Sequence, residues 1–276
     1  MSPLWLLRLA TWLSVSAPPQ LPETVRVASI GYAGGDPRAF GCDRDLCAFE
    51  TLVRSAAGRG ASIIVTPEYS MPQRDAEPRV QIGRRPSSVA APIQAHFSAL
   101  ADSLDIHLAI NLETEDAKGQ LFNSLLVFDP RGMLAARHDK MELFEGERQT
   151  LEPGDTITTL QTPYGRFGLL ICADLYTEPA THRALVEGGG AGEGVSLILF
   201  SAAWTVPVAT RWQAAFAHDW GVYFVAANAS LGDGSGSGIF DPKGRAIGHD
   251  GPLRSIRIAD IPVAPISAAA GSHGAQ

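Results

Sequence analysis

Three short apolar runs in the second half of the chain limit the folds that it can adopt. They cover residues 166–172 ("RFGLLIC"), 195–200 ("VSLILF") and 222–228 ("VYFVAAN"). Their length and continuity are typical of buried strands rather than helices. Helical patterns near residues 180–187 and 210–219 separate them. Strands and helices that alternate in this way predict an α/β protein whose sheets are covered by helices.

The first half of the chain continues the alternation and adds β-hairpins. Apolar patterns predict strands at 25–32, 61–68, 106–112, 122–132 and 134–140, helices at 46–57 and 89–104, and a later strand–turn–strand at 236–248. Hairpins combined with alternating strands and helices indicate mixed sheets. Because no linker-like segment interrupts residues 25–262, we expect one domain there, followed by a loose tail over 263–276.

The N-terminal residues 1–24 have the features of a secretory signal. A short apolar run follows Arg8, the small residues Val15-Ser16-Ala17 offer a cleavage site, and a proline-rich spacer comes next. This interpretation predicts export to the periplasm or the medium; if the segment is instead a packed or disordered extension, the protein is cytoplasmic. The run is too short for a membrane span, and no other segment is a candidate.

Charge, cysteine usage and the absence of known motifs argue against several kinds of ligand. A net charge of -7 argues against nucleic acid or an anionic membrane surface. Cys42 and Cys47 lie close enough in sequence for a local disulfide after export, which would leave Cys172 free; the alternative is two ordinary thiols. A single C-x4-C pair and histidines without ligand spacing predict no metal site. The glycine-rich stretch 188–194 lacks the Lys-Ser/Thr of a P-loop, so no cofactor is expected.

Three chemically versatile residues follow predicted strands at their carboxyl ends, where α/β proteins usually bind ligands. They are Glu68, Lys140 and Cys172. Together they supply what acyl transfer from an amide needs, namely a base, a cation for the oxyanion and a nucleophile. A nearby lysine and a helix N-terminus would both favour the thiolate of Cys172. Singly, each residue also has an ordinary explanation as a turn carboxylate, a surface lysine or a buried thiol.

The surrounding motifs resemble a known family. "TPEYS", "HDKMELFEGERQTLEPGD" and "GLLICADLYTEP" together are similar to the nitrilase superfamily of carbon–nitrogen hydrolases. The resemblance implies a Glu68-Lys140-Cys172 triad and a second active-site glutamate at Glu147. It also implies a four-layer α-β-β-α sandwich of two mixed sheets, which the residue patterns alone do not distinguish from other α/β sandwiches. Family members commonly assemble, so a homodimer or larger homo-oligomer is expected.

A narrower resemblance is to the biotinidase and pantetheinase (vanin) branch. "CADLYTEPA" and "AFAHDWGVYFVAANAS" are similar to segments of that branch. Two positions beside the site depart from the family pattern, because His138 stands where Tyr is common and Ala173 replaces the usual aromatic residue. These departures concern the shape of the pocket and its support rather than the triad. Asp174, two residues after the cysteine, is expected to support the turn.

The resemblance implies hydrolysis of a small-molecule, non-peptide amide through a Cys172 thioester. Lys140 and a backbone N–H near Ala173 would hold the oxyanion, and Trp204 either lines the acyl pocket or is a core aromatic. Two alternatives are an acyltransferase that uses the same thioester and a catalytically silent binding protein. The acyl group is not specified by the sequence, since family specificity resides in loops, here 72–88, 142–150 and 205–211.

Overall fold

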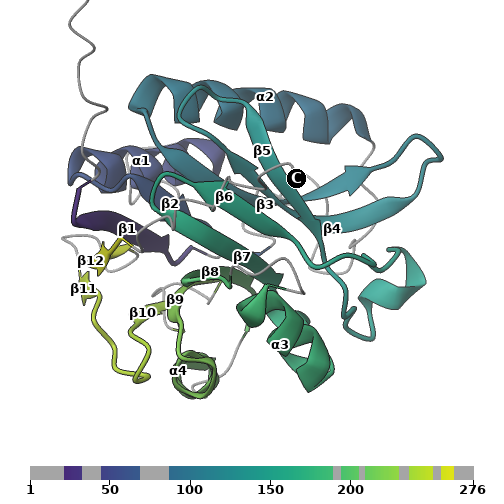
Figure 1. Cartoon of the computed structure of the whole chain (residues 1–276). Coiled ribbons are helices and arrows are strands. Elements are labelled where there is room, and N and C mark those ends of the chain that lie inside the picture. The colour runs from purple at the N-terminus through teal and green to yellow at the C-terminus, as the bar shows by residue number, and fades with distance from the viewer. Residues whose placement is uncertain are drawn as a thin grey trace, which may run out of the picture.

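Two β-sheets lie face to face in the middle of the protein, with helices on both outer sides (Figure 1). The computed structural model describes residues 22–32, 45–68, 87–188, 194–204, 209–229, 236–250 and 256–263. The predicted signal segment before residue 22, the tail after residue 263 and Cys42 lie outside the described residues, as do most of the loops 72–88 and 205–211. The predicted four-layer α-β-β-α sandwich is confirmed.

The two sheets have mixed strand directions, as predicted. The larger sheet has the order β11 (His249–Asp250), β12 (Ile256–Pro262), β1 (Thr24–Ile30), β2 (Ile63–Val65), β3 (His107–Glu115), β4 (Leu121–Phe128), β5 (Leu134–Asp139). The smaller sheet has the order β10 (Gly238–Phe240), β9 (Tyr223–Asn228), β8 (Leu197–Ala202), β7 (Gly165–Ile171), β6 (Thr159–Thr162). Parallel pairs β1–β2–β3 and β7–β8–β9 form the centres, and antiparallel strands flank them.

Each outer layer is a pair of helices. Helices α1 (Asp45–Gly58) and α2 (Ser87–Leu104) cover the larger sheet, whereas α3 (Pro179–Glu187) and α4 (Ala209–Trp220) cover the smaller one, on the opposite side of the molecule in Figure 1. Cys47, in α1, is disulfide-bonded, while Cys172 is free. This is the arrangement that the local-disulfide interpretation of the sequence requires.

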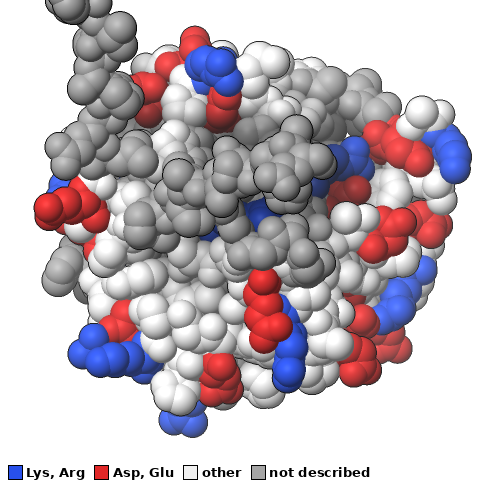
Figure 2. Space-filling view, in the orientation of Figure 1, with Lys and Arg blue, Asp and Glu red and all other residues white. Residues whose placement is uncertain are grey.

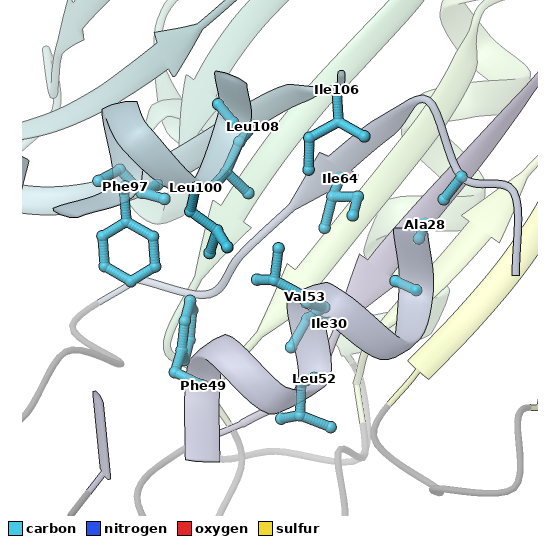
Figure 3. Packing of buried hydrophobic residues seen from close by; sticks show 14 of the residues in the cluster. Ala28, Ile30, Phe49, Leu52, Val53, Ile64, Phe97, Leu100, Ile106 and Leu108 are labelled. Atoms are coloured by element: carbon cyan, nitrogen blue, oxygen red, sulfur yellow. The ribbon is translucent and has the colours of Figure 1, made fainter. Parts of the chain in front are cut away.

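Three apolar clusters fill the three interfaces between the layers. The first cluster lies between the larger sheet and its helices. There, Phe49 and Val53 of α1 and Phe97 of α2 pack against Ile30 and Ile64 of the sheet (Figure 3). The second cluster lies between the sheets, and the third lies between the smaller sheet and its helices. Alternate side chains of a strand point to opposite faces, so every central strand contributes to two of these clusters. This explains the nearly continuous apolar runs in the sequence.

Hydrogen bonds link the two sheets near the carboxyl ends of their central strands. The Ser201 hydroxyl at the end of β8 donates to the carbonyl oxygen of Thr66 at 2.8 Å, and the Ser29 hydroxyl of β1 donates to that of Ala226 in β9. The small serine side chains leave room for these bonds between the sheets. The carboxyl edges of β2, β7 and β8 are thereby brought together.

Sequence patterns missed three strands, β6, β11 and β12. No strand is predicted over the residues of β6 or β12, although the alternation "IRIADI" in β12 fits a strand with two different faces. β12 pairs with β1 along all seven of its residues, so the end of the domain is an integral part of the larger sheet. The second strand expected within 236–248 is reduced to a single bridge between Phe240 and Ala246.

The visible surface carries charges of both signs. On the face shown in Figure 2, Lys and Arg side chains alternate with Asp and Glu, without a patch of one sign. Among the described residues, no helix has the length and apolar character needed to cross a bilayer.

The inter-sheet cluster generates a prediction about stability. Leu199 of β8 is fully buried between the sheets, so Leu199→Ala should leave a cavity and lower the free energy of unfolding by about 2–5 kcal/mol. Leu134→Ala is the matched control, because Leu134 is half exposed at the start of β5. Urea denaturation of both variants measures the difference, and equal losses would contradict the assignment of Leu199 to the core.

Candidate active site

Cys172 occupies a sharp junction between strand β7 and the short 3-10 helix η3 (Cys172–Tyr176). Its φ of 44° lies in the left-handed region, which a residue with a side chain rarely adopts and which costs about 1–3 kcal/mol. Strain of this kind persists only where neighbouring interactions hold it in place. The turn places the thiol at the carboxyl edge of the smaller sheet, as predicted.

Glu68 lies three residues beyond Val65, the last residue of β2, at the carboxyl edge of the larger sheet. Its backbone N–H donates to the carbonyl oxygen of Ala202 in β8 at 3.3 Å, which links the two sheets directly. The Glu68 side chain is buried and forms a hydrogen bond with the Cys172 thiol. A carboxylate and a thiol from different sheets therefore meet at the edge where the sheets converge.

Lys140 reaches the same edge because of the strand directions. β5 is antiparallel to β4, and β4 is antiparallel to β3, so β5 ends on the side where β2 and β3 end. The Lys140 ammonium is buried and donates to Glu68 Oε1 and to Glu147 Oε2, each at 2.7 Å. Glu147, in the short helix η2 (Glu147–Gln149), is buried as well. The structure thus brings together all four residues expected at the site.

Asn123 is a site residue that the sequence patterns did not identify. Its side-chain amide, at the start of β4, donates to Glu68 Oε1 at 2.8 Å and to Glu147 Oε1 at 2.9 Å. Its carbonyl oxygen accepts a bond of 2.6 Å from Asn111 in the next strand, β3. Asn123 therefore holds the carboxylates of Glu68 and Glu147 in place, and Asn111 orients the amide of Asn123. The sequence feature that could have identified Asn123 is its place in an alternating strand, but asparagine is also common on an ordinary polar face of a strand.

Burial and neighbouring charges set the protonation states. Burial alone lowers the pKa of Lys140, but the carboxylates of Glu68 and Glu147 outweigh it and raise that pKa above its ordinary value. Burial raises the pKa of the Cys172 thiol, the charge of Glu68 raises it further, and Lys140 opposes both without cancelling them. The expectation that Lys140 and a helix N-terminus favour the thiolate is therefore outweighed, and the resting site holds a thiol.

Trp204 and Ala173 are the two residues expected to bind substrate next to Cys172. The indole N–H of Trp204, just after β8, donates to Cys172 Sγ at 2.9 Å, while its ring packs edge-on against Phe200 of the adjacent cluster. Trp204 therefore packs on the core, as one of the two interpretations predicts, and its indole N–H also reaches the sulfur; that it lines the acyl pocket stays a prediction. Ala173, where the family usually has an aromatic residue, is buried in η3.

Asp174 connects the cysteine turn with the lysine loop. It is fully buried, and its Oδ1 accepts bonds of 2.9 Å from the backbone N–H groups of Met141 and Glu142. Its Oδ2 accepts from the Ile171 N–H and lies 2.9 Å from His138 Nε2. One carboxylate thereby holds the residues on both sides of Lys140 and the residue before Cys172. His138 takes part in this support from the position where the family often has Tyr.

No group of three or more His, Cys, Asp or Glu side chains suited to hold a metal ion occurs among the described residues. Of the expected specificity loops, the segment 142–150 is described and carries Glu147 into the site. Phe144, in that loop, is largely exposed and donates its backbone N–H to Glu147 Oε2 at 2.7 Å. The loop therefore orients the second glutamate directly.

Fold and site together define an α/β sandwich with a thiol, two carboxylates and an ammonium gathered where its sheets converge, a centre equipped for nucleophilic acyl chemistry. A family model supplies the particular assignment. The carbon-nitrogen hydrolase model matches residues 26–270, and the chain belongs to this family. The resemblance drawn from the motifs is confirmed.

Relatives by sequence include pantetheinases and an omega-amidase. Pantetheinase of Sus scrofa is 34% identical over 245 residues, covering 75% of this chain and 46% of that protein. Omega-amidase NIT2 of Mus musculus is 28% identical over 232 residues, covering 76% and 80%. The chain thus spans about half the length of the pantetheinases that it matches.

Solved structures with the same fold include an amidase from Nesterenkonia sp. and Nit3 of Saccharomyces cerevisiae, described as a member of branch 10 of the nitrilase superfamily. The first has a TM-score of 0.71 and 20% identity, with 88% of this chain and 92% of that chain covered. The second has a TM-score of 0.68 and 24% identity, with 90% and 93% covered. At these identities the likeness concerns the fold alone.

The Asp174 network generates a second prediction. In Asp174→Asn, one end of the side chain becomes an NH₂ donor, so either the Met141 and Glu142 N–H groups or the Ile171 N–H must face another donor. We expect the free energy of unfolding to fall by about 2–4 kcal/mol, since buried donors lose their acceptor. Urea denaturation measures it. Asp219→Asn, at an exposed carboxylate, is the control and should stay within about 0.5 kcal/mol of the parent.

Proposed function

We propose that this protein hydrolyses the C–N bond of a small, non-peptide amide, with Cys172 as the nucleophile. The observation that carries the proposal is that Glu68 contacts both other members of the triad. Its carboxylate accepts a hydrogen bond from the Cys172 thiol and another, of 2.7 Å, from the Lys140 ammonium. A base beside the thiol and a cation beside the base are the arrangement that thioester formation requires.

Acylation begins with transfer of the Cys172 proton to Glu68. The thiolate attacks the amide carbon, and the developing oxyanion is held by the Lys140 ammonium and a backbone N–H near Ala173. Glu68, now protonated, gives its proton to the amide nitrogen as the C–N bond breaks. Ammonia or an amine leaves, and the acyl group remains on the sulfur as a thioester.

Deacylation uses the same residues in reverse. Glu68 takes a proton from water, and the resulting hydroxide attacks the thioester carbon. The C–S bond breaks, the proton returns from Glu68 to the sulfur, and a carboxylic acid leaves. Glu147, bound to Lys140 at 2.7 Å and to Asn123 at 2.9 Å, keeps the ammonium in place through both steps. The high pKa of Lys140 keeps this residue charged throughout.

The substrate is proposed as an amide class rather than as a named compound. Sequence relatives are called pantetheinase and omega-amidase, and the second name denotes a protein that acts on an amide. The match covers less than half of the pantetheinases, so their substrate is not assigned to this chain. We also propose export, because the disulfide at Cys47 suits an oxidising compartment and the N-terminal segment has the features of a signal.

An amide-library screen tests the function. Cys172→Ala should abolish turnover, and Lys140→Ala should reduce it roughly 10²–10³-fold through loss of an oxyanion donor. Lys243→Ala, at an exposed turn lysine, is the matched control and should retain activity. Full amidase activity in Cys172→Ala would refute the mechanism.

Intact-mass measurement during turnover separates the alternatives. An acyl adduct on Cys172 that decays in water supports a hydrolase, and its mass identifies the acyl group. An adduct that is released only when an amine is added would identify an acyltransferase instead. The absence of both adduct and turnover on every amide would indicate a silent binding protein.

Glu68→Gln provides a test of the base that separates its two effects on the thiol. Loss of the negative charge should lower the pKa of Cys172, because Lys140 then acts unopposed, so thiolate-specific modification at pH 7 should become faster. Turnover should nevertheless fall about 10²–10⁴-fold, since the proton acceptor is gone. The measurements are the pH profile of thiol modification and amide turnover. Glu142→Gln is the control, and slower modification in Glu68→Gln would contradict the electrostatic assignment.

A further inference from the structure

The Cys172 sulfur has a hydrogen-bond donor that the proposed mechanism does not use. Trp204 Nε1 lies 2.9 Å from Cys172 Sγ, and an indole nitrogen can only donate. A thiol proton is directed to Glu68, so the indole N–H points at a sulfur lone pair. Such a bond strengthens when the sulfur becomes negative, because donors to charged acceptors bind more strongly than donors to neutral ones.

Formation of the thiolate is the costly step at this site. The sulfur is partly enclosed and faces two charged groups of the larger sheet. They are Glu68, which follows β2, and Lys140, which follows β5. Burial and Glu68 disfavour a negative sulfur, and Lys140 is held by its own two carboxylates. Donors aimed at the sulfur are therefore needed to offset this cost when the proton leaves.

We propose that Trp204 is a catalytic residue whose indole N–H stabilises the Cys172 thiolate while Glu68 holds the proton. This inference rests on the proposed role of Cys172 as nucleophile. In the step, the S–H bond breaks, its electron pair stays on sulfur, and its proton moves to Glu68. Trp204 keeps its own proton and donates it as a hydrogen bond. The backbone N–H of Ala203, which also donates to the sulfur, acts beside it.

Trp204 is fixed so that this bond is in place before the reaction. Its backbone N–H donates to Asn228 Oδ1 at 2.7 Å, and its carbonyl oxygen accepts from Asn228 Nδ2 at 2.8 Å. The Asn228 N–H is in turn held by the Ser237 hydroxyl at 2.8 Å. The indole ring stacks on Tyr176 and packs edge-on against Phe200. A donor oriented in advance stabilises charge without the cost of reorganisation.

The pH dependence of thiol modification tests this role without requiring an amide substrate. The full-length protein is treated with methyl methanethiosulfonate, a neutral reagent whose S–S bond the thiolate cleaves to give a methyl disulfide and methanesulfinate. Intact mass follows the reaction, with Cys172→Ala as background. Trp204→Phe keeps an aromatic ring but lacks the N–H. We expect its modification to be about tenfold slower at pH 7 and its profile to shift to higher pH by roughly one unit.

Two further variants keep the test decisive. Trp212→Phe is the matched control, because Trp212 contacts Tyr176 but is half exposed and is not bonded to the sulfur; its profile should equal that of the parent. Replacement of Trp204 by benzothienylalanine, which keeps the bicyclic shape and loses only the N–H, should reproduce the shift even if Trp204→Phe packs poorly.

Several outcomes would overturn the inference. One is a parent-like profile in both Trp204 variants. Another is an equal shift in Trp212→Phe, and a third is a loss of amide turnover in the Trp204 variants with an unchanged thiol profile, which would make Trp204 a wall of the acyl pocket. None of these results depends on the Cys172→Ala turnover test, so failure of this inference is distinguishable from failure of the proposed function.

Discussion

The site depends on the close approach of the two sheets at one edge. In most sandwiches, apolar side chains keep facing sheets about 10 Å apart. Here Ser201 bonds to the backbone of Thr66, and the N–H of Glu68 bonds to the carbonyl oxygen of Ala202. Bulky side chains at these positions would separate the strand ends. The convergence places a base from one sheet within hydrogen-bond reach of a nucleophile from the other.

Charges at this edge are paired rather than avoided. Lys140, Glu68 and Glu147 are all buried, and a buried ion cluster is weak as a source of stability because each charge loses its hydration. The neutral amide of Asn123 bonds to both carboxylates, and the buried carboxylate of Asp174 holds the backbone next to Lys140. The left-handed backbone at Cys172 is another local cost. Unfavourable features concentrated at one place fit a site that is maintained for chemistry.

The order and strand-end positions of Glu68, Lys140 and Cys172 could be read from the sequence, because apolar runs mark where strands end. The residues that orient these three side chains could not be predicted from the sequence. Asn123 looks like any polar residue of an alternating strand, and its two bonds depend on a pairing between β3 and β4 that no local pattern specifies. The contact between Trp204 and the sulfur depends on the position of the Trp204 backbone, which is held by Asn228, 24 residues away in sequence. Long-range geometry accounts for what was missed.

The protonation states explain why one cluster can serve both halves of the proposed reaction. The pKa of Lys140 is raised, so its charge is constant, and the pKa of Cys172 is raised, so the resting sulfur keeps its proton. Only the proton between Cys172 and Glu68 is then free to move as the reaction proceeds. If the thiol instead lost its proton to the solvent, Glu68 would have no proton to give to the departing nitrogen. The raised thiol pKa, which disfavours the nucleophile, therefore supplies the acid that the leaving group requires.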